Sequence, residues 1–317
     1  MKDDNLEYID ALKGIAIIAV TLVHSGGGGL PGIWGRIGND GARGVQMFFV
    51  ISGMLAFRSL DHYYKHQDIT IKSALSWYVK KIIRIVPLYY LALLMSLIAK
   101  TWSPYWLGSE EHVTGKNILA HIFLLHGLFP HYTDSILSVE WYLGCLWLFF
   151  LVSPFLFKYI DTLEKSVIFG VFLYIVLPLL SAKLALVIPI GDDSQIYDAY
   201  VGTFGPLKQF LVYMFGIILY FVIKRLKDLK NDSITALSYA LLIFGMIALY
   251  GQVNDASTIY RLSRDEMFGL WFFVIILSQA LHSSRLIVNP VFKVFGKYSY
   301  GIYLFQFVWL KSYDRYI

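Results

Sequence analysis

Long runs of apolar residues, separated by short polar stretches, follow one another along the whole chain. Each run is continuously apolar, whereas the strands of a membrane β-barrel alternate residue by residue. A run of about 20 apolar residues forms a helix long enough to cross a hydrocarbon layer of about 30 Å. We therefore predict an all-α fold, a polytopic membrane protein built as a bundle of about ten transmembrane helices.

Polar or helix-breaking residues bound each of the predicted spans. The spans lie at residues 9–24, 44–60, 76–99, 117–129, 139–157, 166–189, 206–223, 234–250, 266–282 and 294–311. The run at 117–129 is short, so it either crosses the membrane or enters and leaves it on one side. Because no internal repeat or low-complexity linker divides the sequence, we predict a single membrane-embedded domain over residues 1–317.

Composition and charge support this class of protein and suggest its orientation. Of the 317 residues, 57% are hydrophobic and 15% are charged, whereas soluble domains contain about 25% charged residues. The net charge of +5 comes from basic residues scattered among loops, which indicates membrane orientation and not nucleic-acid binding. The densest basic stretch, 58–84, predicts a cytoplasmic loop and a cytoplasmic N-terminus. The basic stretch 224–230 conflicts with this orientation, because a count of ten crossings places it outside.

Two ionisable residues lie in the first predicted span. Lys13 and His24 are eleven positions apart, so both project from one face of a helix, about 16 Å apart along its axis. Burying such groups costs several kcal/mol unless they are paired or used. Two interpretations follow: the residues belong to a functional site, or Lys13 pairs with Asp10 while His24 ends the span at the interface.

Three further polar positions interrupt or begin apolar segments. Ser52 and Gly53 lie within the run VQMFFVISGMLA, where small residues let a helix or a ligand approach closely. Lys81 and Arg84 lie one turn apart just before an apolar span, where they either anchor it in the cytoplasm or bind phosphate groups. Glu140 begins a long apolar segment, where it either caps a helix or orients a histidine.

Five segments, in their order and spacing, resemble the integral-membrane acyltransferase 3 family. The segments are YIDALKGIAIIAVTLVH, GVQMFFVISGMLAF, VKKIIRIVPLYY, SVEWYL and GKYSYGIYLFQFVW. Members of this family transfer acyl groups, commonly acetyl from acetyl-CoA, to carbohydrates of the cell envelope. The resemblance therefore implies a membrane O-acyltransferase that uses an acyl-CoA donor and modifies a cell-envelope or lipid-linked carbohydrate.

The resemblance also implies roles for individual residues. By it, His24 matches the essential histidine of the family's first span and Glu140 matches the acidic residue of its Ser-x-Glu segment, so these are the predicted catalytic residues. The predicted donor-binding or substrate-binding residues are Lys13, Phe49, Ser52, Lys81 and Arg84. Lys stands at positions 13 and 81 where the family usually has Arg, which keeps the charge but loses the bidentate fork. Gln306 stands where many members have a second histidine, so no catalytic role is expected there.

The charges of coenzyme A suggest how the donor binds. Its phosphates cannot enter hydrocarbon, so the nucleotide is expected at the cytoplasmic Lys81 and Arg84, while the uncharged pantetheine arm, roughly 15 to 20 Å long, reaches toward His24. His24 would act as a general base on the acceptor hydroxyl or would carry the acyl group itself. Glu140 would orient His24, and Ser52 would donate to the substrate or oxyanion.

The expected partners are acyl-CoA, a carbohydrate or lipid-linked glycan acceptor and membrane lipid, with no nucleic acid and no permanently bound cofactor. We expect the bacterial inner membrane, with the N-terminus in the cytoplasm. A glycan transporter or flippase is the alternative function, because it also needs polar groups inside a helical bundle. We predict no metal site, because His121 and His126 are five positions apart and would form an incomplete ligand set.

Overall fold

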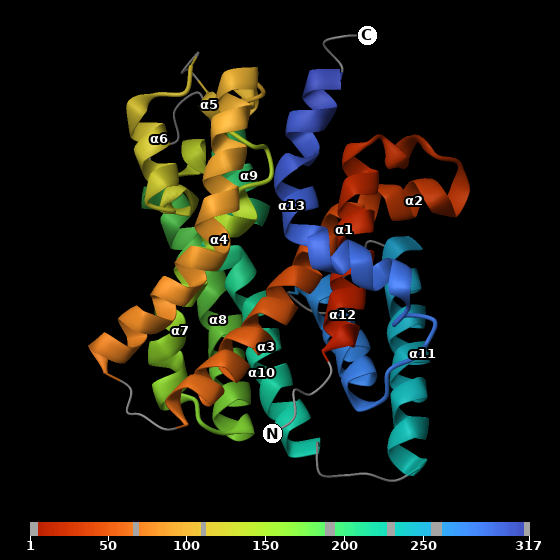
Figure 1. The fold of residues 1–317 in the computed structure, drawn as a ribbon. Helices are drawn as coiled ribbons and strands as arrows, with labels where there is room; N and C mark the ends of the chain where they lie inside the picture. Colours follow the sequence, from red (N-terminus) through yellow and green to blue (C-terminus); the bar gives the residue numbers. More distant parts are fainter. Residues whose placement is uncertain are drawn as a thin grey trace. The chain divides into compact units, whose positions relative to one another are not determined.

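The computed structural model describes residues 6–65, 70–108, 112–187, 194–226, 232–254 and 262–313 (Figure 1). Helices account for nearly all of the regular structure in these ranges, and no strand occurs among them. The all-α prediction is therefore confirmed. The chain divides into two compact units: unit 1 contains Met1–Leu55 and Val212–Tyr303, and unit 2 contains Ala56–Leu211 and Leu304–Ile317. Each unit is described separately below.

Unit 1 is built around the first helix of the chain. Its elements are α1 (Glu7–His24), η1 (Gly27–Gly29), α2 (Gly32–Asp40), η2 (Gly41–Arg43), the first part of α3 (Gly44–Tyr64), most of α10 (Pro206–Leu226), α11 (Asp232–Asn254), α12 (Arg264–Leu281) and the first part of α13 (Pro290–Tyr313). Side chains on one face of α1, such as Leu12, Ile17 and Val20, are almost completely buried. This buried apolar face fixes α1 within the unit.

Glycines allow two pairs of helices in unit 1 to pack backbone against backbone. A Cβ atom added to Gly53 of α3 would overlap the Tyr213 carbonyl oxygen of α10, and one added to Gly216 of α10 would overlap the Val50 carbonyl oxygen. Gly14 of α1 and Gly296 of α13 form a similar close contact, because an added Cβ at either position would overlap the other helix's backbone. Small residues at helix interfaces are typical of membrane bundles, and here they bring the helix carrying Phe49 and Ser52 tightly against α10.

Unit 2 contains the remaining helices and most of the short ones. Its elements are the end of α3, α4 (Ile71–Ala99), α5 (Pro104–Leu107), α6 (Gly115–Ile122), η3 (His126–Leu128), η4 (Pro130–Tyr132), α7 (Trp141–Tyr159), α8 (Leu163–Val187), α9 (Ser194–Ala199), η5 (Tyr200–Phe204), the start of α10 and the end of α13. In Figure 1, α5, α6 and α9 lie near the same end of α4. The short elements thus gather at one end of this unit's long helices.

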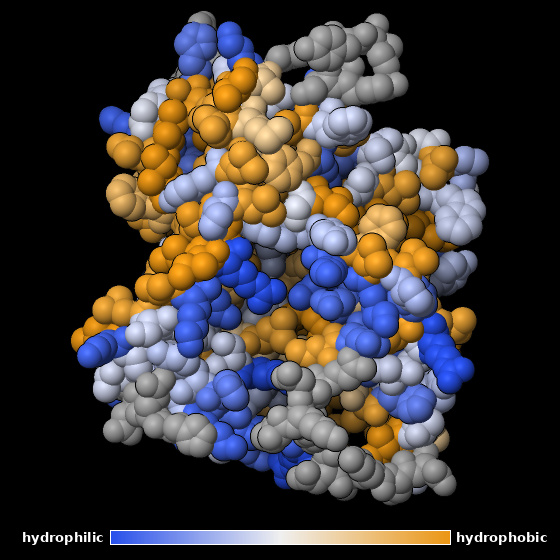
Figure 2. Space-filling model, viewed as in Figure 1, coloured by the Kyte–Doolittle hydropathy of each residue, from blue (hydrophilic) through white to orange (hydrophobic). Residues whose placement is uncertain are grey.

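Nine of the ten predicted spans coincide with long helices in the described residues. Five helical segments there are long and apolar enough to cross a membrane, namely Ile71–Ala99, Trp141–Tyr159, Leu163–Leu184, Ser194–Leu226 and Ser233–Asn254. Leu94 and Ile98 of α4 have 55% and 73% of their surface exposed, and Figure 2 shows apolar side chains gathered over that part of the helix. Such a surface suits contact with lipid, so the protein is a membrane protein, whereas the predicted count of about ten crossings is not confirmed.

Of the two interpretations of the run at 117–129, the one that makes it a membrane-crossing helix is wrong. The structure has the eight-residue helix α6 there, which at 1.5 Å per residue is about 12 Å long, and this helix ends at Ile122. Leu124 then takes a positive φ of 57°, and the chain continues as the 3₁₀ turns η3 and η4. A helix of this length is too short to cross the hydrocarbon layer, and the chain turns directly after it.

Candidate functional site

Lys13 and His24 both lie on α1, as the sequence predicts. The Lys13 amine is 4.0 Å from the Asp10 carboxylate and the Lys13 side chain is 17% exposed, so the pairing considered from the sequence is present. His24 is the last residue of α1 and is partly exposed. The helix ends there because Gly26, with a φ of 82°, turns the chain in the left-handed conformation that favours glycine.

The segment after His24 forms the short elements η1, α2 and η2 and caps α1 within unit 1. Gly27 contacts Leu22 and Gly41 contacts Ala19, so the segment folds back on the last turns of α1. Two ion pairs join this segment to the start of α12. The Arg264 guanidinium lies 2.7 Å from the Asp40 carboxylate, and the Arg43 guanidinium pairs with the buried carboxylate of Asp265. His24 therefore lies next to a segment whose position is fixed by these contacts.

Phe49 and Ser52 lie on α3 within unit 1. The Phe49 ring is completely buried, whereas Ser52 is partly exposed. Gly53, the next residue, allows the close approach of α10 described above, so its small size has a structural explanation. The buried Phe49 ring is therefore part of the hydrophobic core. The polar side chain of Ser52 is partly accessible.

Lys81 and Arg84 lie one turn apart on α4 in unit 2 but have different surroundings. The Lys81 amine lies 4.6 Å from the centre of the Trp77 ring and 5.1 Å from that of Phe150, a cation–π arrangement. Arg84 is exposed. The aromatic rings therefore fix the position of the Lys81 amine, whereas the Arg84 side chain projects from the surface of the helix.

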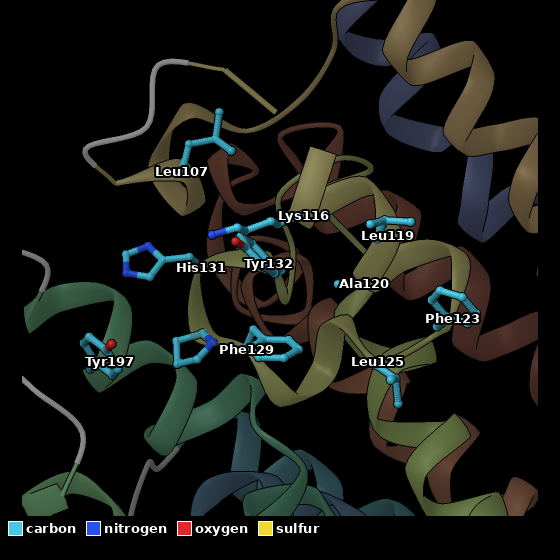
Figure 3. A pocket seen from close by; sticks show the side chains of 11 residues that line it. Leu107, Lys116, Leu119, Ala120, Phe123, Leu125, Phe129, His131, Tyr132 and Tyr197 are labelled. Carbon is cyan, nitrogen blue, oxygen red and sulfur yellow. The ribbon is translucent and has the colours of Figure 1, made fainter. Parts of the chain in front are cut away.

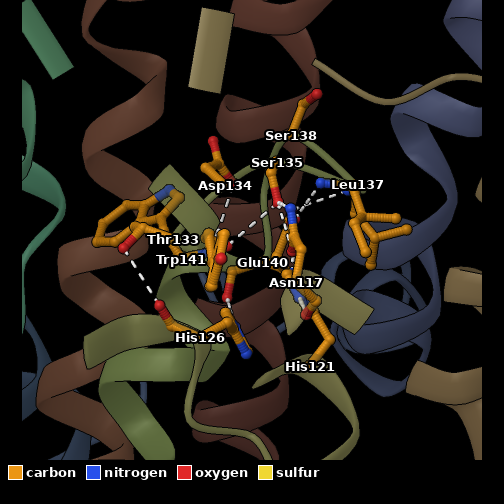
Figure 4. A network of polar contacts seen from close by, with 12 residues as sticks. Asn117, His121, His126, Thr133, Asp134, Ser135, Leu137, Ser138, Glu140 and Trp141 are labelled. Carbon is orange, nitrogen blue, oxygen red and sulfur yellow. Dashed lines mark hydrogen bonds and ion pairs between the residues drawn. The ribbon is translucent and has the colours of Figure 1, made fainter. Parts of the chain in front are cut away.

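Glu140 lies in a buried polar network in unit 2 (Figure 4). Its carboxylate accepts hydrogen bonds from the backbone N–H groups of Ile136, Leu137 and Val139 at 2.6, 3.0 and 3.1 Å, and lies 3.3 Å from Nε2 of His121. A carboxylate has about four acceptor positions, and these four donors occupy them. Glu140 therefore fixes the loop that precedes α7. The predicted relation of Glu140 to His24, which belongs to the other unit, remains a prediction.

The charge of Glu140 follows from its neighbours. Burial acts to raise the pKa of Glu140, but the hydrogen bond and charge of His121 outweigh it and hold that pKa well below its ordinary value. Nδ1 of His121 lies 2.9 Å from the Asn117 carbonyl oxygen, so both ring nitrogens of His121 face acceptor oxygens. The His121 ring and the Glu140 carboxylate therefore form a completely buried pair.

Three further residues of the network were not predicted from the sequence. Nε2 of His126 lies 3.1 Å from the Glu140 carbonyl oxygen, and burial of this ring lowers the pKa of His126 to about 3. Burial and the nearby Glu140 charge raise the pKa of Asp134, whose carboxyl group accepts the Trp141 N–H at 3.3 Å. Lys311 donates to the Ser138 hydroxyl at 2.8 Å and so ties the end of α13 to the same loop. In the sequence, only the interruption of an apolar run by HYTDS hinted at this network.

Comparisons with known proteins identify the family of the chain. Residues 6–317 match the acyltransferase 3 family model, which is described as "Acyltransferase domain". A "Putative O-acetyltransferase" of Staphylococcus aureus strain COL is 26% identical over an alignment that covers 94% of this chain and 50% of the relative. A "Putative acetyltransferase" of Acidianus two-tailed virus is 24% identical over 94% of this chain and 81% of the relative. The chain thus spans about half the length of the staphylococcal relative. No solved structure matches it.

Proposed function

Because the chain belongs to the acyltransferase 3 family, we propose that it transfers an acyl group from an acyl-CoA to a hydroxyl group of a cell-envelope or lipid-linked carbohydrate. The family match over residues 6–317 carries this proposal. The names of the relatives support acetyl as the acyl group and oxygen as the accepting atom. Acetyl-CoA is then a substrate and no permanently bound cofactor is needed.

The chemistry is assigned to His24. In the direct mechanism its imidazole takes the proton of the acceptor hydroxyl while that oxygen attacks the thioester carbonyl. The carbon–sulfur bond then breaks, and the proton passes to the departing coenzyme A thiolate. In the alternative mechanism the imidazole first accepts the acyl group and then passes it to the hydroxyl. The partly exposed position of His24 at the end of α1 supports either role.

The other predicted residues have supporting roles in this proposal. Ser52 donates a hydrogen bond to the oxyanion, and Phe49 fixes the α3 segment that presents Ser52. Glu140, whose acceptor positions are occupied, acts by fixing the loop that precedes α7. Lys13, already close to Asp10, adds positive charge near the other end of α1. Lys81 and Arg84 bind the phosphates of the donor. The position of the Lys81 amine is already fixed by the Trp77 ring, so this side chain loses little conformational entropy on binding.

We further propose nine crossings in the bacterial inner membrane, with the N-terminus in the cytoplasm. If α6 does not cross, then α1, α3, α4, α7, α8 and α10 are six successive crossings, and α10 ends in the cytoplasm. Its last turn contains Lys224 and Arg225, so the basic stretch that conflicted with ten crossings now satisfies the positive-inside rule. The three helices α11, α12 and α13 complete the count.

A contact within unit 2 supports the same count. The Trp106 ring, which precedes α6, packs edge to face on the Phe204 ring with centroids 5.2 Å apart. Counting 117–129 as a crossing would put these two loops on opposite sides of the membrane, where they could not touch. Without that crossing, both loops are outside.

The activity is tested by incubating the purified protein with labelled acetyl-CoA and envelope glycans from the source cells. Transfer of label to glycan supports the proposal, and hydrolysis without transfer contradicts it. The topology is tested with the single substitutions His112→Cys and Asp228→Cys. The thiol of His112→Cys should react with an impermeant reagent in intact cells, and that of Asp228→Cys only after the inner face is opened.

A further inference from the structure

A pocket of about 600 Å³ lies on unit 2 beside α6, and none of the residues predicted from the sequence lines it (Figure 3). Its two ends differ in chemistry. Lys116, His131, Tyr132 and Tyr197 gather at one end, and Leu119, Phe123 and Leu125 lie at the other. The pocket is therefore amphipathic, which is the character required to bind a ligand with a polar head and an apolar chain.

The polar end contains a cation and several rings. Within the described residues, no hydrogen bond or ion pair engages the amine of Lys116, so its charge is available to an anion. The rings of His131 and Tyr197 meet edge to face with centroids 5.9 Å apart and form a wall of this end. A positive charge beside aromatic and phenolic groups suits a phosphate that is attached to a sugar ring.

The apolar end is open to the surroundings. Leu119 is 54% exposed and Phe123 is 65% exposed. Exposed leucine and phenylalanine side chains at the mouth of a pocket are unfavourable in water, but in a membrane protein they can contact lipid chains. A hydrocarbon chain can therefore leave the pocket directly into the bilayer.

The position of the pocket along the chain also matters. Its lining comes from the loop between α4 and α7 and from α9, between α8 and α10. In the nine-crossing topology both segments lie outside the cytoplasm, on the side where a cell-envelope carbohydrate is presented. The hydrogen bond from the Tyr105 hydroxyl to the Gln195 carbonyl oxygen, at 3.2 Å, joins the same two segments.

We infer that this pocket binds the acceptor as a phosphate-bearing lipid that carries a sugar. The phosphate binds Lys116, the sugar lies against Tyr132, Tyr197 and His131, and the hydrocarbon chain passes over Leu119 and Phe123. An ordinary phospholipid would use the cation and the apolar end but not the rings of the polar end. The inference rests on the proposed function, because it takes the bound lipid to be the acyl acceptor.

Native mass spectrometry of the full chain, released from phosphatidylcholine nanodiscs, tests this directly. The probes are a short polyprenyl diphosphate N-acetylglucosamine, the same lipid without sugar, and phosphatidylglycerol. We expect the sugar-bearing lipid to bind most tightly and the other two to compete weakly. Lys116→Gln should weaken its binding at least about tenfold, since it removes a charge-assisted bond. Ala120→Leu should also weaken binding, because it fills the pocket without changing charge.

Lys208→Gln is the matched control, because this lysine lies in unit 2 at the start of α10 but does not line the pocket. It should bind the sugar-bearing lipid like the parent. Equal competition by phosphatidylglycerol, or unchanged binding in both Lys116→Gln and Ala120→Leu, would overturn the inference. Binding is measured without acetyl-CoA, so its failure is distinct from that of the proposed function. The latter would appear as absent acetyl transfer despite normal lipid binding.

Discussion

The imidazole rings of His121 and His126 stack in unit 2 with centroids 4.4 Å apart and planes 8° from parallel. Two imidazolium ions at this distance would repel each other strongly, so at most one ring carries a charge. His126 is the neutral ring, because burial and then the nearby His121 lower the pKa of His126 and outweigh the hydrogen bond to the Glu140 carbonyl oxygen, which acts to raise it. His121 is the ring that pairs with the Glu140 carboxylate.

Removing the ring that pairs with Glu140 should destabilise the protein. His121→Ala leaves the Glu140 carboxylate buried without this partner, and breaking a buried ion pair typically costs about 3 to 5 kcal/mol in the free energy of unfolding. The double variant His121→Ala/Glu140→Gln should recover part of the loss, because a neutral amide needs no counter-charge. Thermal unfolding in detergent gives the order of stabilities. A double variant less stable than His121→Ala would show that no charge pair existed.

Acid should destabilise the protein through His126. The pKa of His126 is about 3 in the folded protein and about 6.5 when the ring is free, so its contribution is complete above pH 6.5 and is lost as the pH falls toward 3. His126→Gln retains a donor toward the Glu140 carbonyl but does not titrate. The melting temperature of the parent should therefore fall between pH 6.5 and 4.5 more steeply than that of the variant. Parallel curves would contradict a neutral buried His126.

The close contact of α3 and α10 should not tolerate a side chain at Gly53. Gly53→Ala places a methyl group on the Tyr213 carbonyl oxygen, and such overpacking costs about 1 to 3 kcal/mol in the free energy of unfolding. Gly251→Ala is the control, because this glycine lies in α11 and its added Cβ meets no atom within 4 Å. The control should be as stable as the parent or slightly more so. Equal melting temperatures for both variants would show that the contact is looser than described.

The helices could be predicted from the sequence because a continuous apolar run has few alternatives to a membrane helix. The run at 117–129 misled the prediction because it is as apolar as a span, although it forms a short helix and a turn around His121 and His126. Hydropathy records the average polarity of a segment, whereas these two histidines are buried by pairing with Glu140 and its backbone. Only the fold brings residues 121 and 140 together.

The candidate site was predicted less completely than the fold. The pairing of Lys13 with Asp10 could be predicted because both lie on one helix, one turn apart. The aromatic surroundings of Lys81 could not, since Phe150 lies far away in the sequence. Lys116 likewise has no distinguishing neighbours in the sequence, and only the pocket gives it a proposed role.

The two cations proposed to bind the donor, Lys81 and Arg84, should contribute differently. Arg84→Ala removes an exposed charge, so it should weaken acetyl-CoA binding by about 1.5 to 3 kcal/mol without lowering the melting temperature. Lys81→Ala should weaken binding and also lower the melting temperature, because it removes contacts with Trp77 and Phe150. Titration calorimetry at low and high salt measures the binding, and both effects should shrink at high salt. Unchanged affinity in the double variant at low salt would place the nucleotide elsewhere.

Among the predicted residues, His24 is the one whose substitution best distinguishes a role in catalysis from a role in folding. It is partly exposed at the end of α1, so His24→Ala should insert, fold and bind acetyl-CoA much like the parent. Acetyl transfer should nevertheless fall at least about 100-fold, or about 2.7 kcal/mol of lost transition-state stabilisation. His24→Gln should be about equally inactive, because an amide keeps the size of the side chain but cannot take a proton near neutral pH.

His112→Ala is the control for His24, because His112 is an exposed histidine in the segment assigned to the outer side. It should transfer acetyl at the parental rate. Rates are compared with labelled acetyl-CoA at saturating donor, and melting temperatures confirm that each variant is folded. If folded His24→Ala retains more than about a tenth of the parental rate, less than about 1.4 kcal/mol of the barrier depends on the imidazole. His24 would then only end a helix at the membrane surface, and the proton acceptor would have to be another residue.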